Sequence, residues 1–156
     1  MIKVTNKIEY KIVDWIVNNI QKIKNIDNFS SNPNAIDFLK LTPTIINWNK
    51  LSSNFRAIEI LNSNINYINW IELSKNSNAI NLLENYINKI NWNMLSSNSN
   101  AINLLENNIN KINWKILSKN KSALFLLENN KNFIFWNYLA LNPSIFVKIY
   151  YWKYRF

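Results

Sequence analysis

A 22-residue pattern recurs along most of this chain and constrains its fold more than any other feature. Tryptophan marks position 1 of the pattern, at Trp48, Trp70, Trp92, Trp114 and Trp136. Alanine marks position 10, at Ala35, Ala57, Ala79, Ala101 and Ala123. A fixed period of this length is typical of stacked structural repeats. We therefore expect six repeats, at 26–47, 48–69, 70–91, 92–113, 114–135 and an incomplete 136–156.

Each repeat is predicted to contain two short helices. The first helix follows position 22, an N-cap candidate in four repeats: Asn47, Asn69, Asn91 and Asn113. The second helix is predicted to begin at position 7, which is asparagine in every repeat: Asn32, Asn54, Asn76, Asn98, Asn120 and Asn142. Proline follows two of these asparagines, and proline favours the first position of a helix because no N–H is needed there. The pattern thus predicts an all-α fold, an α-solenoid of short helix pairs.

The apolar positions predict which side chains form the core. Leucine dominates positions 4 and 14, isoleucine dominates position 21, and position 10 is alanine in five of the six repeats. The tryptophans share the spacing of these residues, so we expect them to be buried as well. A leucine-rich repeat has a similar period, but position 14 is apolar throughout, where the exposed face of a strand would be polar. The Asn-Pro sequences also favour helices over that alternative.

The N-terminal segment does not follow the repeat. Between residues 6 and 24, isoleucine and tryptophan recur at helical spacing, which predicts a single amphipathic helix. Because the end units of repeat proteins need a more polar outer face, we expect residues 1–25 to cap the repeats of 26–156.

Composition excludes several kinds of chemistry. The chain has no histidine and no cysteine, so imidazole acid–base catalysis, thiol catalysis, disulfides and the usual zinc sites are absent. No nucleophile–base pair or phosphate-binding loop is present either. We therefore expect a protein that is not an enzyme, with no catalytic, cofactor-binding or metal-binding residues and no small-molecule substrate. No apolar run is long enough to span a membrane, which predicts a cytoplasmic protein without a membrane partner.

The C-terminal third departs from the repeat in charge and in aromatic content. The chain carries a net charge of +9, and residues 114–156 hold seven basic side chains against Glu128 alone. Position 12, polar in the first four repeats, becomes phenylalanine in the fifth. An aromatic and basic surface is typical of a binding site, whereas the alternative is a hydrophobic C-terminal cap. The predicted partner-binding residues are Phe125, Tyr150, Tyr151, Trp152, Lys153, Tyr154, Arg155 and Phe156.

The predicted partner is another protein or a second copy of the chain. Nucleic acid, most plausibly RNA, is the alternative, since lysine and arginine attract phosphates.

The repeat motif Asn-Trp-x-x-Leu-Ser-x-Asn-(Pro/Ser)-x-Ala-Ile-x-Leu-Leu-Glu-x-Asn resembles short tandem repeats in uncharacterised proteins of amoeba-infecting giant DNA viruses. The resemblance covers about residues 26–142 and is strongest in the central three repeats. The first repeat lacks the tryptophan and the last lacks Leu-Leu-Glu, as expected for end units. The resemblance implies a viral repeat scaffold without a common activity, located in the host-cell cytoplasm or the virion.

Overall fold

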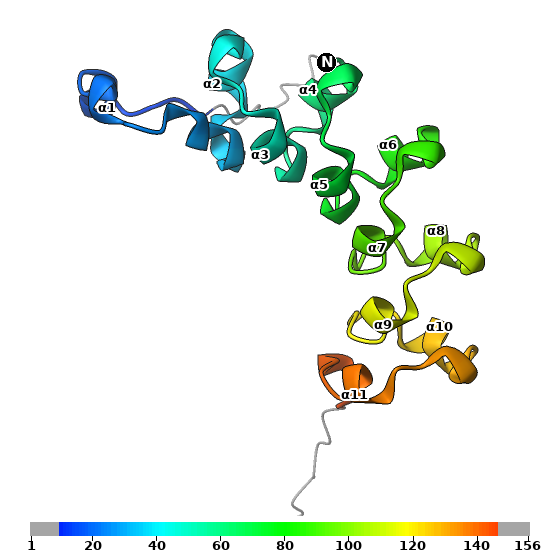
Figure 1. Cartoon of the computed structure of the whole chain (residues 1–156). Helices are drawn as coiled ribbons and strands as arrows, with labels where there is room; N and C mark the ends of the chain where they lie inside the picture. Colours follow the sequence, from blue (N-terminus) through cyan, green and yellow to red (C-terminus); the bar gives the residue numbers. More distant parts are fainter. Residues whose placement is uncertain (1–9, 147–156) are drawn as a thin grey trace, which may run out of the picture. The chain divides into compact units, whose positions relative to one another are not determined.

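The computed structural model describes residues 10–146, and every regular element in that range is helical (Figure 1). The predicted all-α fold, an α-solenoid of short helix pairs, is confirmed. The chain consists of two compact units, unit 1 (Met1–Ile90) and unit 2 (Asn91–Phe156). This division falls one residue before the tryptophan that opens the fourth repeat.

Unit 1 contains the N-terminal segment and the first three repeats. Its elements are α1 (Asp14–Val17), η1 (Ile20–Lys22), η2 (Ile26–Ser31), η3 (Pro33–Ala35), α2 (Ile36–Leu41), η4 (Pro43–Ile45), α3 (Trp48–Ser53), α4 (Ile58–Asn62), η5 (Ile65–Tyr67), α5 (Trp70–Lys75), α6 (Ile80–Asn85) and η6 (Ile87–Lys89), where η denotes a 3₁₀ helix. Each repeat has a first helix, a second helix and a closing 3₁₀ turn. The first helices α3 and α5 pack side by side, as Figure 1 shows.

Unit 2 repeats the same order in shorter elements. They are α7 (Trp92–Leu95), α8 (Ile102–Glu106), η7 (Ile109–Lys111), α9 (Trp114–Leu117), α10 (Leu124–Glu128), η8 (Lys131–Phe133), α11 (Trp136–Leu139) and η9 (Pro143–Ile145). The described part of the last repeat ends after η9, and Phe146 adopts an extended conformation.

Leucines at positions 4 and 14 form the core of both units, as predicted. Nine of them are buried: Leu39, Leu51, Leu61, Leu73, Leu83, Leu95, Leu105, Leu117 and Leu127. The alanines at position 10 are buried as well, and their small side chains allow the backbones to approach closely. Helices of one or two turns are unstable in isolation, so this burial between neighbouring repeats supplies much of the stability.

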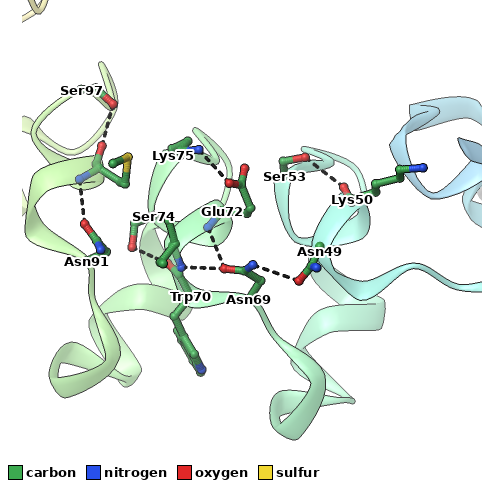
Figure 2. A network of polar contacts seen from close by, with 12 residues as sticks. Asn49, Lys50, Ser53, Asn69, Trp70, Glu72, Ser74, Lys75, Asn91 and Ser97 are labelled. Atoms are coloured by element: carbon green, nitrogen blue, oxygen red, sulfur yellow. Dashed lines mark hydrogen bonds and ion pairs between the residues drawn. The ribbon is translucent and has the colours of Figure 1, made fainter.

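Asparagine at position 22 caps the first helix, as predicted. The side-chain oxygen of Asn69 accepts the backbone N–H groups of Ile71 at 3.0 Å and of Glu72 at 3.2 Å (Figure 2). Asn113 caps α9 in the same way, by accepting the N–H of Ile116 at 3.0 Å.

Asparagine at position 7 is a helix N-cap in the first and last repeats, as predicted, where Asn32 caps the 3₁₀ helix η3 and Asn142 caps η9. In the four repeats between them it is not the N-cap of the second helix. The Asn54 side chain accepts the N–H of Arg56 at 3.1 Å, but α4 begins only after Ala57. The asparagine therefore starts a turn that precedes the second helix. Its side-chain amide points the other way and donates to the backbone of the preceding repeat.

These amide contacts link neighbouring repeats, and we call them the asparagine ladder. In unit 1, the Asn76 side chain donates to the carbonyl oxygens of Ser52 at 3.1 Å and Asn54 at 3.0 Å. In unit 2, Asn142 donates to the carbonyl oxygens of Ser118 at 3.2 Å and Asn120 at 2.8 Å. Each amide thus bonds to carbonyl groups that lie 22 and 24 residues earlier in the sequence, about one repeat away.

A buried serine at position 5 links the first helix of its repeat to the last residue of that repeat, which directly precedes the next first helix. The hydroxyl of Ser52 donates to the Trp48 carbonyl at 2.7 Å, and its oxygen accepts the Asn69 N–H at 3.0 Å. In unit 2, Ser118 bridges the Trp114 carbonyl and the Phe135 N–H in the same way. The serine therefore joins the first helix of one repeat to the residue that directly precedes the first helix of the next.

The N-terminal segment differs from the predicted single helix over residues 10–24. Only α1 and η1 are helical there, and the Trp15 side chain is 69% exposed instead of buried. Asn19 contributes to this early end, because its side-chain amide donates to the Trp15 carbonyl at 2.8 Å and competes with continued helical bonding. Residues 6–9 of the predicted helix lie outside the described range.

The repeat tryptophans also differ from the prediction, because the first four are half-buried and Trp136 is exposed, so none is a core residue. Trp48 stacks on Tyr67 with ring centroids 4.8 Å apart, and Trp114 stacks on Phe133 at the same distance. The Lys111 ammonium lies 4.7 Å from the centroid of the Trp92 ring. A ring or cation later in the same repeat therefore contacts each of these indoles, which remain partly in solvent.

The buried leucines generate a first prediction. Leu105→Ala should lower the free energy of unfolding by roughly 2–5 kcal/mol, because truncating a fully buried leucine leaves a cavity. Denaturant unfolding followed by circular dichroism measures this change. Asn103→Ala is the matched control on an exposed position of the same helix and should change stability by less than about 0.5 kcal/mol.

The asparagine ladder generates a second prediction within unit 1. Asn76→Ala removes the turn contact and leaves two carbonyl groups of the preceding repeat without their donor, which should cost about 3 kcal/mol. Asn32→Ala removes only the turn contact to Asn34, because Asn32 is exposed, and should cost about 1 kcal/mol. Equal losses in the two denaturant unfolding curves would contradict the ladder.

Candidate functional site

The last two repeats expose large apolar side chains at positions that are polar in the interior repeats. Phe125, on α10, is 70% exposed and occupies position 12, which is Asn81 or Asn103 in the central repeats. Leu141 is 67% exposed and occupies position 6, which is serine or lysine in the earlier repeats. These substitutions place apolar surface where the repeat pattern otherwise faces water.

Three further aromatic residues are exposed, one at the end of the fifth repeat and two on the last repeat. Phe135 replaces the position-22 asparagine, so α11 begins without a side-chain cap. Trp136 is 65% exposed, in contrast to the half-buried tryptophans before it, and Phe146 is 78% exposed. We call the exposed residues Phe125, Phe133, Phe135, Trp136, Leu141 and Phe146 the C-terminal aromatic surface.

Two lysines of the fifth repeat converge on a tyrosine of the sixth. The ammonium groups of Lys115 and Lys119 lie 4.8 Å and 5.4 Å from the centroid of the Tyr138 ring. Hydrogen bonding to Lys115, together with the charges of both lysines, lowers the pKa of Tyr138 below its ordinary value of 10. Tyr138 in turn packs edge-on against Phe135 with ring centroids 6.4 Å apart, so the basic group adjoins the aromatic surface.

The basic charge of unit 2 is not neutralised locally. Among the described residues of this unit, no lysine lies within 4 Å of a carboxylate, whereas unit 1 pairs Lys50 with Asp27 at 2.9 Å and Lys75 with Glu72 at 2.8 Å. In unit 1, the hydrogen bond from Lys50 lowers the pKa of Asp27 below its ordinary value. In the described part of unit 2, Lys115 and Lys119 therefore contact an aromatic ring and have no carboxylate partner.

The structure places one of the predicted partner-binding residues, Phe125, on the C-terminal aromatic surface. The other seven, Tyr150, Tyr151, Trp152, Lys153, Tyr154, Arg155 and Phe156, lie outside the described residues. The other members of the surface were not predicted. A comparison by repeat position indicates two of them, since Phe135 stands where earlier repeats carry an N-cap asparagine and Leu141 where they carry serine or lysine.

Within residues 10–146, the acidic side chains form no group of three that could hold a metal ion. Glu84, Glu106 and Glu128, which recur at position 15, are all exposed. Nor does any helix in this range have the length and apolarity needed to cross a membrane. A hollow of about 320 Å³ beside Phe133 is lined mainly by polar residues of the η8 turn, including Lys131 and Asn132.

Comparisons with known proteins found no match to a family model, to a curated protein or to a solved structure. The resemblance to viral tandem repeats therefore stays a prediction from the sequence motif.

Proposed function

We propose that the chain is a non-enzymatic helical-repeat scaffold that binds a protein partner through the C-terminal aromatic surface. The observation that carries this proposal is the exposure of Phe125, Phe135 and Leu141 at positions that are polar in interior repeats. Exposed apolar patches mark interaction sites, and aromatic side chains contribute most of the binding energy at many protein interfaces.

The charge beside this surface indicates the chemistry of the partner. Lys115 and Lys119 have no carboxylate partner within the described part of unit 2, so an acidic surface with apolar side chains complements the site. Residues 150–156 continue the aromatic and basic composition and belong to the same proposal by composition alone. The resemblance to giant-virus repeats supports a location in the host-cell cytoplasm or the virion.

A double substitution tests the protein-binding proposal. Phe125→Asn and Phe135→Asn restore the residues that interior repeats carry, and together they should abolish recovery of partners by affinity capture and mass spectrometry. Phe135→Asn also supplies the missing N-cap of α11 and should raise the free energy of unfolding by about 1 kcal/mol. Loss of binding together with gained stability cannot result from misfolding.

Phe55→Ser is the matched control for that experiment. Phe55 is 48% exposed in unit 1, and its position 8 is serine in the next two repeats, so the substitution removes a comparable ring elsewhere. Recovery of partners should be unchanged by this variant. Equal recovery with the double variant and the intact chain would contradict the proposal.

RNA binding is the second candidate function, favoured by the convergence of Lys115 and Lys119 on Tyr138. Two ammonium groups without a carboxylate partner are available for phosphate oxygens, whereas a purely apolar protein contact does not need them. Aromatic rings such as Phe135 and Trp136 would then provide surfaces on which bases stack.

A salt titration distinguishes the two functions. RNA affinity, measured by fluorescence anisotropy with a labelled single strand, should fall steeply with salt because bound counterions are released. Lys115→Gln with Lys119→Gln should reduce the slope of log affinity against log salt by about 1.4, on the basis of ~0.7 per phosphate contact. Lys89→Gln, an exposed lysine of unit 1, serves as the control. An affinity that does not depend on salt would rule out RNA as the ligand.

A further inference from the structure

The asparagine ladder leaves an unused donor in the first repeat. Asn32 accepts the N–H of Asn34 at 2.9 Å, but its side-chain amide donates to no described residue. Asn32 is exposed, whereas the equivalent asparagines Asn54, Asn76 and Asn142 are buried against a preceding repeat. We call Asn32 and its surroundings the donor end.

The donor end is hollow. A cavity of about 410 Å³ opens beside Asn32 and is lined by Ile23, Lys24, Asn25, Asn28 and Phe29. Phe29 occupies position 4, where the leucines of the next four repeats are fully buried, yet Phe29 is only half-buried. The first repeat thus has an apolar residue and a polar donor at a concave surface, and no repeat precedes it within the described residues.

The last repeat leaves the matching acceptors without a side-chain donor among the described residues, although the Asn142 carbonyl accepts the backbone N–H of Ile145 at 3.4 Å. Asn142 donates to the carbonyl oxygens of Ser118 and Asn120 in the preceding repeat. One repeat later, the equivalent carbonyls belong to Ala140 and Asn142, and no side chain of the described residues donates to them. Ala140 is exposed and lies next to Leu141. We call these two carbonyl groups the acceptor end.

We propose that the chain self-associates head to tail, with the Asn32 amide of one copy donating to the carbonyl oxygens of Ala140 and Asn142 of the next copy. The contact continues a junction that the chain already builds, because Asn76, Asn120 and Asn142 each make the same pair of bonds to the repeat before them. The inference rests on the proposed function, since it uses the last repeat as a contact surface, and it identifies one partner as a second copy.

This junction is weaker than those inside the chain. Interior junctions also have a serine hydroxyl that accepts a backbone N–H, as Ser52 does from Asn69 at 3.0 Å. Ala140 replaces that serine and has no hydroxyl, so the junction between copies lacks this bond. Because the two contacting surfaces differ, the contact does not close by two-fold symmetry and produces open oligomers that grow with concentration.

Charge gives the association a distinctive salt dependence. Residues 1–25 carry five lysines against Glu9 and Asp14, and residues 114–156 are strongly basic, so the two ends repel each other. Salt screens this repulsion and should strengthen self-association. RNA binding has the opposite salt dependence.

Sedimentation velocity of the full chain over a concentration series tests the inference, and the sedimentation coefficient should rise with concentration. Asn32→Asp keeps an oxygen for the Asn34 N–H but removes the amide donor, and it should weaken self-association about tenfold or more. Asn34→Asp adds the same charge two residues away and should leave the association intact. Asn32→Ser, whose hydroxyl retains the turn contact but is too short to reach another copy, repeats the test without the charge.

Mixing two blocked chains tests the head-to-tail direction. Ala140→Lys places a long cation on an exposed position of the acceptor end, so this variant and the uncharged Asn32→Ser should each stay monomeric at concentrations at which the wild-type chain associates. Their mixture should form dimers and nothing larger, because one intact donor end then meets one intact acceptor end. A monomeric mixture, a wild-type chain that is monomeric at all concentrations, or an Asn32→Asp chain that associates normally would overturn the inference.

The outcome can be separated from that of the proposed function. If the wild-type chain is monomeric but Phe125→Asn with Phe135→Asn still abolishes partner capture, the head-to-tail contact is wrong and the scaffold function stands. If head-to-tail dimers form but the phenylalanine substitutions leave partner capture unchanged, the head-to-tail contact stands and the proposed protein-binding surface is wrong.

Discussion

The hydrogen bonds between repeats are the interaction on which the rest of this structure depends. Its helices contain three to six residues, too few to be stable in isolation. Leucine burial supplies hydrophobic stabilisation, but it does not by itself fix the offset between neighbouring repeats. The position-7 amide does, because it must reach two particular carbonyl groups. Among the described residues, no buried polar side-chain atom lacks a partner, so the network is complete in the interior.

The same network makes the two end repeats chemically different from the others. A repeat with a neighbour on each side donates in one direction and accepts in the other, so a linear array leaves a donor at one end and acceptors at the opposite end. The exposed amide of Asn32 and the carbonyl of Ala140 follow from this polarity. Burying either group without a partner would be costly, so these ends either remain hydrated or meet complementary groups.

The sequence predicted the fold and the leucine core because the 22-residue period and the spacing of the apolar residues can be read directly from the sequence. It did not predict that Asn76 links repeats, because an asparagine that starts a turn and one that also donates to a neighbouring backbone have the same one-letter pattern. The half-buried state of Trp48 was missed for a related reason, since the stacking of Tyr67 on its indole depends on tertiary geometry. In the candidate site, Phe125 was predicted because the same position is polar in the earlier repeats. Predicting Phe135 requires the knowledge that the asparagine at position 22 caps a helix in those repeats.

These constraints decide where recognition can occur. In interior repeats, the polar side chains most suited to bind a ligand are already used. Asn120, for example, makes two bonds to the preceding repeat and one within its own turn. Any ligand that took these groups would have to break the stack. The proposed binding surface therefore uses positions that the packing leaves unconstrained, and Phe125 and Leu141 occupy two such positions. A repeat protein built in this way acquires function by changing its outward positions and its ends, while its interior pattern remains the same.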